Sequence, residues 1–233
     1  MNLFYCQNLS KKKISLSKEE SRHCIKVLRK KKNDIIRVTN GKGTIYITKI
    51  SSIENETVQL ENLKTEFILN RKTKIHIAIA PPKNRIRFEW FLEKVTEVGV
   101  DIITPLLCTN SERKQINLIR SQKILISAMK QSNNSILPQI NNPTPFKDFL
   151  ERIENNSYIA HCHTMKKVDF KTILAKQKKD KNITVMIGPE GDFTREEIIM
   201  SEKRGIQSIK LGENRLRTET AGIISCNMIN TIL

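Results

Sequence analysis

From Lys74 onward, short apolar runs alternate with stretches in which apolar residues recur at helical spacing. The apolar runs predict strands over residues 75–79, 100–107, 158–162, 183–187 and 206–211. The helical spacing predicts helices over residues 85–98, 118–129, 170–177, 194–203 and 218–232. Because this alternation is typical of a parallel sheet covered by helices, we predict an α/β domain.

The N-terminal part of the chain has a different pattern and predicts a small β-rich unit with one helix. Residues 17–20 have the spacing of a capping box that opens a helix. Two β-branched runs, 35–39 and 44–48, flank an Asn-Gly turn and predict a hairpin. A further strand around residues 56–60 fits a small barrel or sandwich. Residues 63–73 carry no strong pattern, and we interpret them as a link between domains.

The chain is strongly basic, with 41 Lys and Arg against 24 Asp and Glu and a net charge of +17. The excess is +7 in residues 1–70 and +10 in the remainder, so it is not confined to one tail. A surface of this charge attracts phosphate backbones and indicates a nucleic-acid partner. The alternative is a compositional bias, because the sequence is also rich in Ile and Asn.

Other features of the sequence favour a cytoplasmic protein with reduced thiols. The five cysteines are scattered and lack CxxC spacing, which argues against a disulfide framework. We expect no signal peptide and no membrane span, since no apolar run reaches the required length. His161-Cys-His163 has no further ligand cluster nearby in the sequence, so we expect no metal site.

Two glycine-containing loops are candidates for ligand binding. Each follows a predicted strand and opens a predicted helix: Gly188–Thr194 and Leu211–Ala221. Loops at the carboxyl ends of parallel strands are where α/β proteins bind ligands, and two adjacent loops could embrace an adenosine. Arg215 and Arg217 could hold a phosphate or a uracil carbonyl there. The alternatives are an ordinary turn for the first loop, and an Arg217–Glu219 salt bridge that caps the last helix for the second.

The pairing of these loops resembles the RsmE family of SPOUT methyltransferases, which methylate N3 of a uridine in 16S ribosomal RNA. The matching segments cover nearly the whole chain: His23…Val27-Leu-Arg29, Asn40-Gly-Lys-Gly43, Lys94-Val-Thr-Glu-Val-Gly-Val100 with Ile103-Thr-Pro105, Ser127-Ala-Met-Lys-Gln-Ser132 with Leu137-Pro138, Ile187-Gly-Pro-Glu-Gly191 and Leu211-Gly…Leu216-Arg-Thr-Glu-Thr-Ala221. The chain departs from the family pattern at Asp192, where a second glycine is usual, at Lys130, where an acid is usual, and at Asn134, where arginine is usual.

The resemblance implies a PUA-like β-barrel that binds RNA over residues 1–70 and a trefoil-knotted SPOUT domain over residues 73–233. It implies S-adenosylmethionine as the cofactor, a homodimer, and 16S ribosomal RNA, within the 30S subunit, as the partner. The expected cofactor-binding residues are His163, Gly188, Pro189, Glu190, Gly191, Leu211, Gly212, Leu216 and Arg217. The expected RNA-binding residues are Arg22, Arg29, Lys30, Lys83 and Arg85, although the lysine run that begins at Lys30 could equally be a solvated edge.

The expected catalytic residues are Arg217 and Glu219. We expect Arg217 to stabilise negative charge that develops on the uracil oxygens. Glu219 could take the N3 proton or orient Arg217, and the sequence leaves both roles open. Two other functions remain open as well: methylation of another RNA, such as tRNA or a ribose 2′-hydroxyl, and a non-catalytic role as an RNA-binding ribosome-assembly factor.

Overall fold

The computed structural model describes residues 2–7, 9, 14–68, 73–153, 156–177 and 181–233. The chain divides into two compact units, each with its own sheet. The first unit contains Met1–Asn70 and Ile126–Leu137, and the second contains Arg71–Leu125 and Pro138–Leu233.

The first unit is built on a five-stranded sheet with the order β1-β3-β4-β5-β2. Its strands are β1 (Leu3–Tyr5), β2 (Ile14–Ser15), β3 (Ile35–Thr39), β4 (Thr44–Glu54) and β5 (Thr57–Phe67). The predicted hairpin is confirmed as the antiparallel pair β3–β4, and β1 runs parallel to β3. Alternate residues of these strands, with Cys24 and Leu16, form the core of the unit.

The turn between β3 and β4 packs against residues 126–137. Gly43 donates its amide to the Ser135 carbonyl at 3.0 Å, and Leu137 donates to the Gly41 carbonyl at 2.8 Å. Gly41 has φ +75°, and a Cβ there would lie 2.8 Å from the Leu137 Cβ. Only glycine therefore fits this turn, because other residues meet both the φ penalty and the clash.

Two sequence interpretations of the first unit need correction. The link expected over residues 63–73 begins later, since β5 continues to Phe67 and pairs with β4 along its length. The second half of β5 is mostly exposed on both faces, so it lacks the apolar alternation that marks a strand. The expected short helix is α-helical only at its start: α1 (Lys18–Arg22) passes directly into a π-helical turn, η1 (His23–Val27).

The second unit is a parallel sheet with the order β11-β13-β10-β12-β6-β7-β8, and β9 pairs with β7. Its strands are β6 (Ile75–Ile79), β7 (Ile102–Leu107), β8 (Gln139–Ile140), β9 (Thr144–Pro145), β10 (Ser157–Ala160), β11 (Val168–Asp169), β12 (Ile183–Ile187) and β13 (Gln207–Lys210). Its helices are α2 (Arg85–Val98), α3 (Leu118–Gln131, which ends in the first unit), α4 (Phe146–Arg152), α5 (Phe170–Lys176), α6 (Arg195–Lys203) and α7 (Thr218–Ile232). The predicted parallel α/β domain is confirmed, whereas α4 was not predicted.

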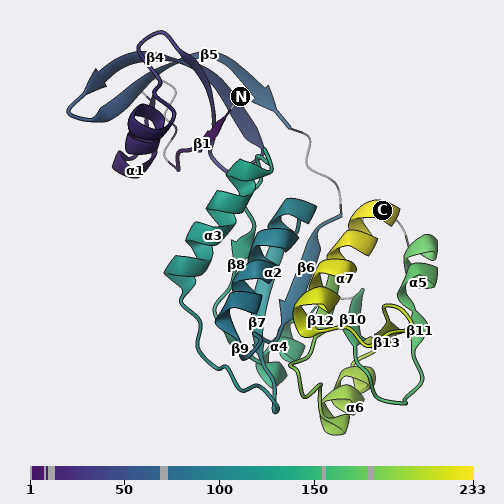
Figure 1. Cartoon of the computed structure of the whole chain (residues 1–233). Coiled ribbons are helices and arrows are strands. Elements are labelled where there is room, and N and C mark those ends of the chain that lie inside the picture. Colours follow the sequence, from purple (N-terminus) through teal and green to yellow (C-terminus); the bar gives the residue numbers. More distant parts are fainter. Residues whose placement is uncertain (1, 8, 10–13, 69–72, 154–155, 178–180) are drawn as a thin grey trace. The chain divides into compact units, whose positions relative to one another are not determined.

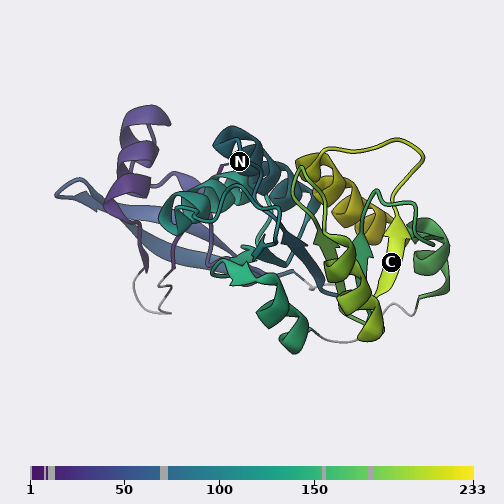
Figure 2. The same cartoon turned by 90° about the horizontal axis from the view of Figure 1, so that it is seen from below.

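Helices cover both faces of this sheet, with α2 and α7 on one face and α4 and α6 on the other (Figures 1 and 2). Along β6, Ala78 faces the core that α4 and α6 share, while Ile79 faces α7. Gly222 of α7 is buried, and a Cβ there would lie 2.6 Å from Cε2 of Phe91 on α2. The missing side chain therefore lets α7 approach α2 and β6 closely and sets the register of the two helices.

Candidate functional site

A pocket of about 520 Å³ lies at the carboxyl ends of β10, β12 and β13. Its walls are the three loops that follow these strands, together with Arg87 from α2. In the sheet, β10 lies between β12 and β13, so the two loops singled out in the sequence are separated by a third. The carboxyl end of a parallel sheet is the expected place for a ligand, and the volume is that of a small-molecule site.

Most of the expected cofactor-binding residues line this pocket. The lining includes Gly188, Pro189, Glu190, Leu211, Gly212, Leu216 and Arg217. His163 and Gly191 lie outside the lining. A ring nitrogen of His163 lies 2.7 Å from the Phe193 carbonyl oxygen, and the Gly191 carbonyl accepts a hydrogen bond from Asn110 at 3.1 Å.

The loop after β12 is held in a compact shape by its own side chains. A Cβ on Gly188 would lie 3.0 Å from Phe193, so the loop closes tightly there. The hydroxyl of Thr218 donates to the Gly188 carbonyl at 3.0 Å and connects this loop to the start of α7. The predicted capping box of α6 is confirmed, with Thr194 and Glu197 each accepting from the backbone amide of the other. Such a loop is ordered before any ligand arrives.

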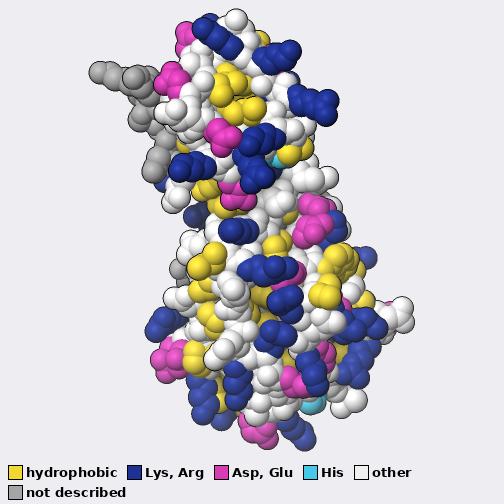
Figure 3. All heavy atoms as spheres, turned by 60° about the vertical axis from the view of Figure 1, so that its left-hand side comes forward, with side chains coloured by type: hydrophobic (Ala, Val, Ile, Leu, Met, Phe, Trp, Pro, Cys, Tyr) yellow, Lys and Arg dark blue, Asp and Glu magenta, His cyan; other side chains and the backbone are white. Residues whose placement is uncertain are grey.

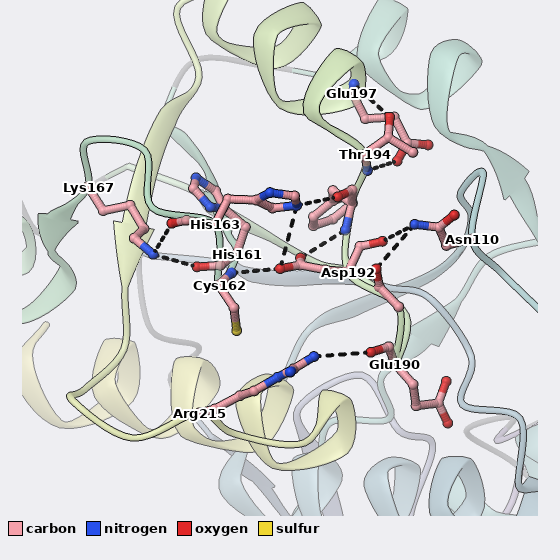
Figure 4. Close-up of polar contacts among 12 residues, drawn as sticks. Asn110, His161, Cys162, His163, Lys167, Glu190, Asp192, Thr194, Glu197 and Arg215 are labelled. Atoms are coloured by element: carbon pink, nitrogen blue, oxygen red, sulfur yellow. Dashed lines mark hydrogen bonds and ion pairs between the residues drawn. The ribbon is translucent and has the colours of Figure 1, made fainter.

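Asp192 connects this loop to the loop after β10 (Figure 4). Its carboxylate accepts hydrogen bonds from the amides of Cys162 at 2.7 Å and Phe193 at 2.8 Å. Its backbone has φ +62°, the left-handed region that favours glycine, which is the residue usual in the family that the chain resembles. Asn110 donates to the Asp192 carbonyl from the other side at 3.1 Å. The side chain that departs from the family pattern therefore has a structural use in this chain.

The loop after β10 was expected at the pocket through His163, and it contributes His161, Cys162 and Lys167 instead. His161 is 7% exposed, and neither ring nitrogen has a hydrogen-bond partner among the described residues. Burial, assisted by the nearby Lys167 ammonium, lowers the pKa of His161 to about 4, so the ring is neutral at pH 7. Lys167 donates to the carbonyls of His161 at 3.0 Å and His163 at 2.7 Å. Their position directly after a strand was the available signal.

The loop after β13 brings two arginines to the pocket. Arg215 donates to the Glu190 carbonyl at 3.4 Å, which links it to the loop after β12. Arg217 is the N-cap residue of α7, and its side chain is exposed. Within the described residues, its guanidinium has neither an ion-pair nor a hydrogen-bond partner. The guanidinium is therefore available to an anionic group in the pocket.

The alternative interpretation of the sequence, a salt bridge between Arg217 and Glu219, is wrong. The Glu219 side chain is 6% exposed, and its Oε1 lies 3.7 Å from Nε of Arg87. Its Oε2 is buried and has no hydrogen-bond partner among the described residues. Arg87 was missed in the sequence because nothing in the spacing of α2 distinguishes it from an ordinary exposed arginine.

The expected RNA-binding residues fall on both units. In the first unit, Arg22 and Arg29 are exposed and Lys30 is half-buried. Arg29 has φ +51° and follows the π-helical turn, a conformation uncommon for a side-chain-bearing residue. In the second unit, Lys83 pairs with Glu112 at 2.7 Å, and Arg85 pairs with Glu89 at 3.3 Å. Lys and Arg side chains are spread over the face drawn in Figure 3, among acidic and apolar ones.

The position of Lys130, another departure from the family pattern, also has a structural explanation. Its ammonium pairs with Glu20 within the first unit, where both side chains are largely buried. Glu20 has the capping-box position after Ser17, whose hydroxyl accepts from the Glu20 amide at 3.2 Å. The Glu20 carboxylate is directed to Lys130, so only half of the predicted capping box is formed.

The described parts of the chain contain neither a candidate metal site nor a candidate membrane-spanning helix. No group of three His, Cys, Asp or Glu side chains there could hold a metal ion. Among the same residues, no helix is both long and apolar enough to span a membrane.

Comparison with known proteins identifies the family. Residues 69–230 match the family described as RNA methyltransferase domain, and residues 16–61 match RNA methyltransferase PUA domain. The ribosomal RNA small subunit methyltransferase E of Buchnera aphidicola (subsp. Acyrthosiphon pisum) is 31% identical over 92% of this chain and 86% of that protein.

Solved structures are similar to this chain over nearly their whole length, and two of them illustrate the match. A probable rRNA-methyltransferase from Porphyromonas gingivalis has 31% identity and a TM-score of 0.92, covering 100% of this chain and 98% of that one. A ribosomal RNA small subunit methyltransferase E from Neisseria gonorrhoeae, bound to S-adenosyl methionine, has 26% identity and a TM-score of 0.84. The match covers 100% of this chain and 98% of that one. The chain, a mixed α/β protein with a PUA-like domain, therefore belongs to the ribosomal RNA small subunit methyltransferase E family.

Proposed function

We propose that this protein transfers the methyl group of S-adenosylmethionine to N3 of a specific uridine in 16S ribosomal RNA. The observation that carries the proposal is the pocket, which is lined by residues 187–190, 211–218 and Ala221 from the two segments that resemble the RsmE family. The Neisseria gonorrhoeae relative, with 26% identity over the whole chain, binds S-adenosyl methionine. Family membership and pocket geometry thus support the same activity.

The residues of the pocket fit S-adenosylmethionine. Gly188 and Gly212 let the backbone approach a ligand closely. The neutral ring of His161, buried and without a partner among the described residues, can donate from one nitrogen and accept at the other. Those roles suit the polar edge of an adenine or a ribose. The cofactor supplies a methyl group on a sulfonium, which is already a good donor, so the protein must chiefly align the nucleophile.

Uracil N3 carries a proton at neutral pH, and that proton must leave before or during the transfer. Negative charge then develops on the uracil oxygens. Arg217 is exposed in the pocket and its guanidinium has no partner among the described residues, so it is suited to stabilise this charge. Glu219, on the first turn of α7, either accepts the proton or positions an arginine.

The finer architecture belongs to the same proposal. We propose a PUA-like barrel over residues 1–70 that binds RNA through Arg22, Arg29 and Lys30, and a trefoil-knotted SPOUT domain over residues 73–233, with Lys83 and Arg85 as further RNA contacts. The return of the chain from β13 to α7, which packs on α2, β6 and β12, supports the knot. A homodimer and a substrate presented by the 30S subunit complete the proposal, which places the enzyme in the cytoplasm.

Methyl transfer from labelled S-adenosylmethionine tests the proposal. The substrates are 30S subunits that lack the modification, free 16S RNA and tRNA, and the product nucleosides are identified by mass and retention. We expect 3-methyluridine from the subunits and none from tRNA. Label in tRNA or on a ribose would indicate a different target. Failure to bind the cofactor and to label any substrate would indicate a non-catalytic RNA-binding factor.

A further inference from the structure

We infer that Arg87 is a substrate-binding residue that contacts an anionic oxygen of the target nucleotide, and that Glu219 is the residue that positions it. The inference rests on the proposed function and adds a residue to its site. Arg87 lies on the first turn of α2, 38% of its side chain is exposed, and it lines the pocket. It reaches the pocket from α2, whereas the rest of the lining comes from the ends of β10, β12 and β13, the loops that follow them and the start of α7.

The packing of α2 on α7 places Arg87 beside Glu219. Arg87 and Phe91 are four residues apart and share one face of α2, and Glu219 and Gly222 are three apart on α7. The close approach of Gly222 to Phe91 fixes the register of the two helices. One turn toward the start of each helix, the same register brings the Arg87 guanidinium to 3.7 Å from the Glu219 carboxylate. Figure 1 shows α2 and α7 side by side.

The pairing leaves both partners incompletely satisfied. At 3.7 Å, the contact is an ion pair longer than a hydrogen bond, and Glu219 Oε2 has no partner among the described residues although it is buried. A guanidinium has five N–H donors, and one carboxylate oxygen engages few of them. The remaining donors of Arg87 are available to the pocket. Glu219 is not part of the pocket lining, so it acts on a ligand through Arg87.

A double-mutant cycle of Arg87→Ala and Glu219→Gln tests the inference. Steady-state methyl transfer to 30S subunits is measured for both single variants, the double variant and Arg87→Lys. We expect Arg87→Ala to lower kcat/KM about 100-fold, as loss of one charge-stabilising donor does. Glu219→Gln should lower it about 10-fold, and the double variant should be no worse than Arg87→Ala, because the two residues act as a unit.

The kinetic parameters identify which oxygen Arg87 contacts. A fall in kcat at unchanged KM indicates a uracil oxygen that gains charge in the transition state. A rise in KM indicates a phosphate if the salt dependence of RNA binding also falls by the equivalent of about one phosphate contact. Arg87→Lys keeps the charge without the planar fork, so partial recovery is expected with either oxygen.

Cofactor titration and urea unfolding of each variant separate these effects from misfolding. The double variant removes both charges, so it avoids the unpaired buried carboxylate that Arg87→Ala leaves. Lys94→Ala, on the same helix but paired with Glu97 at 3.0 Å, is the matched control and should transfer at the wild-type rate.

Wild-type kcat and KM in Arg87→Ala would overturn the inference alone. A second result would also overturn it: the effects of Arg87→Ala and Glu219→Gln on kcat/KM are independent, and Glu219→Gln loses one limb of the pH–rate profile. That result would make Glu219 a proton acceptor. A wild-type enzyme that labels no RNA would overturn the proposed function and the inference together.

Discussion

The carboxylate of Asp192 should hold the loops after β10 and β12 together, and three substitutions separate its contributions. Asp192→Ala removes the hydrogen bonds to the Cys162 and Phe193 amides and keeps a side chain at φ +62°. Hydrogen bonds to a charged group contribute about 1.5–3 kcal/mol each, and partial exposure of this loop reduces that to about 1 kcal/mol each. Loss of two bonds therefore predicts a destabilisation of about 2 kcal/mol.

Asp192→Gly loses the same bonds but relieves the left-handed backbone, and the relief is about 1 kcal/mol. Asp192→Asn keeps one acceptor oxygen and a residue that tolerates this φ, so its cost should stay below about 1 kcal/mol. The expected order of stability is wild type, Asn, Gly, Ala. Urea unfolding followed by circular dichroism measures the order, and titration with S-adenosylmethionine shows whether affinity follows it.

The order has a clear refutation. If Asp192→Ala, which keeps a side chain at φ +62°, were as stable as the wild type and bound the cofactor equally well, the carboxylate would contribute nothing.

Three further predictions concern packing, pH and a buried ion pair. Gly222→Ala places a Cβ 2.6 Å from Phe91 and should destabilise by about 1–2 kcal/mol in urea unfolding, although alanine favours a helix elsewhere; a stabilised variant would contradict the packing. Burial lowers the pKa of His76 to about 4 from an ordinary value near 6.5. As the pH falls, the imidazole is therefore protonated in the unfolded chain before it is protonated in the folded protein. Stability that is present above pH 6.5 is lost as the pH falls toward 4. The loss from this group is at most about 3 kcal/mol, and His76→Gln should show a shallower pH dependence than the wild type in unfolding measured across that range. Lys130→Ala leaves the Glu20 carboxylate buried without its partner and should lower the free energy of unfolding by about 2 kcal/mol. The double variant with Glu20→Gln should recover most of this loss. Equal stabilities of the single and double variants would contradict the prediction.

Local signals were sufficient for most of the second unit. The strand β12 is buried throughout and apolar at every position except Thr184, and α6 begins with a complete capping box, so the residues near each of them specify the element. The second half of β5 was missed because pairing with β4, rather than its own pattern, makes it a strand. Strand pairing is non-local, and an exposed strand leaves little trace in the hydrophobic pattern.

The pocket illustrates the same limit at the level of the site. The loops after β12 and β13 could be assigned to it because strand ends bind ligands in parallel sheets. The strand order, which inserts β10 between them and adds His161, follows from pairings between distant segments. The partner of Glu219 likewise depends on how α7 packs against α2, and no spacing in the sequence specifies Arg87 as that partner.

Two of the carboxylates near the pocket, those of Asp192 and Glu219, differ in a way that separates a structural role from a functional one. Asp192 uses both oxygens on backbone amides, so its hydrogen-bonding capacity serves the shape of the loops. Glu219 is buried with one oxygen unpaired among the described residues, and an unsatisfied buried polar atom costs about 1–3 kcal/mol. Proteins tolerate such costs mainly at functional sites, where a group is held ready for a partner that arrives later. Because Glu219 contacts Arg87 and Arg87 lines the pocket, we infer that the carboxylate holds the arginine ready and that the arriving RNA oxygen accepts hydrogen bonds from the guanidinium.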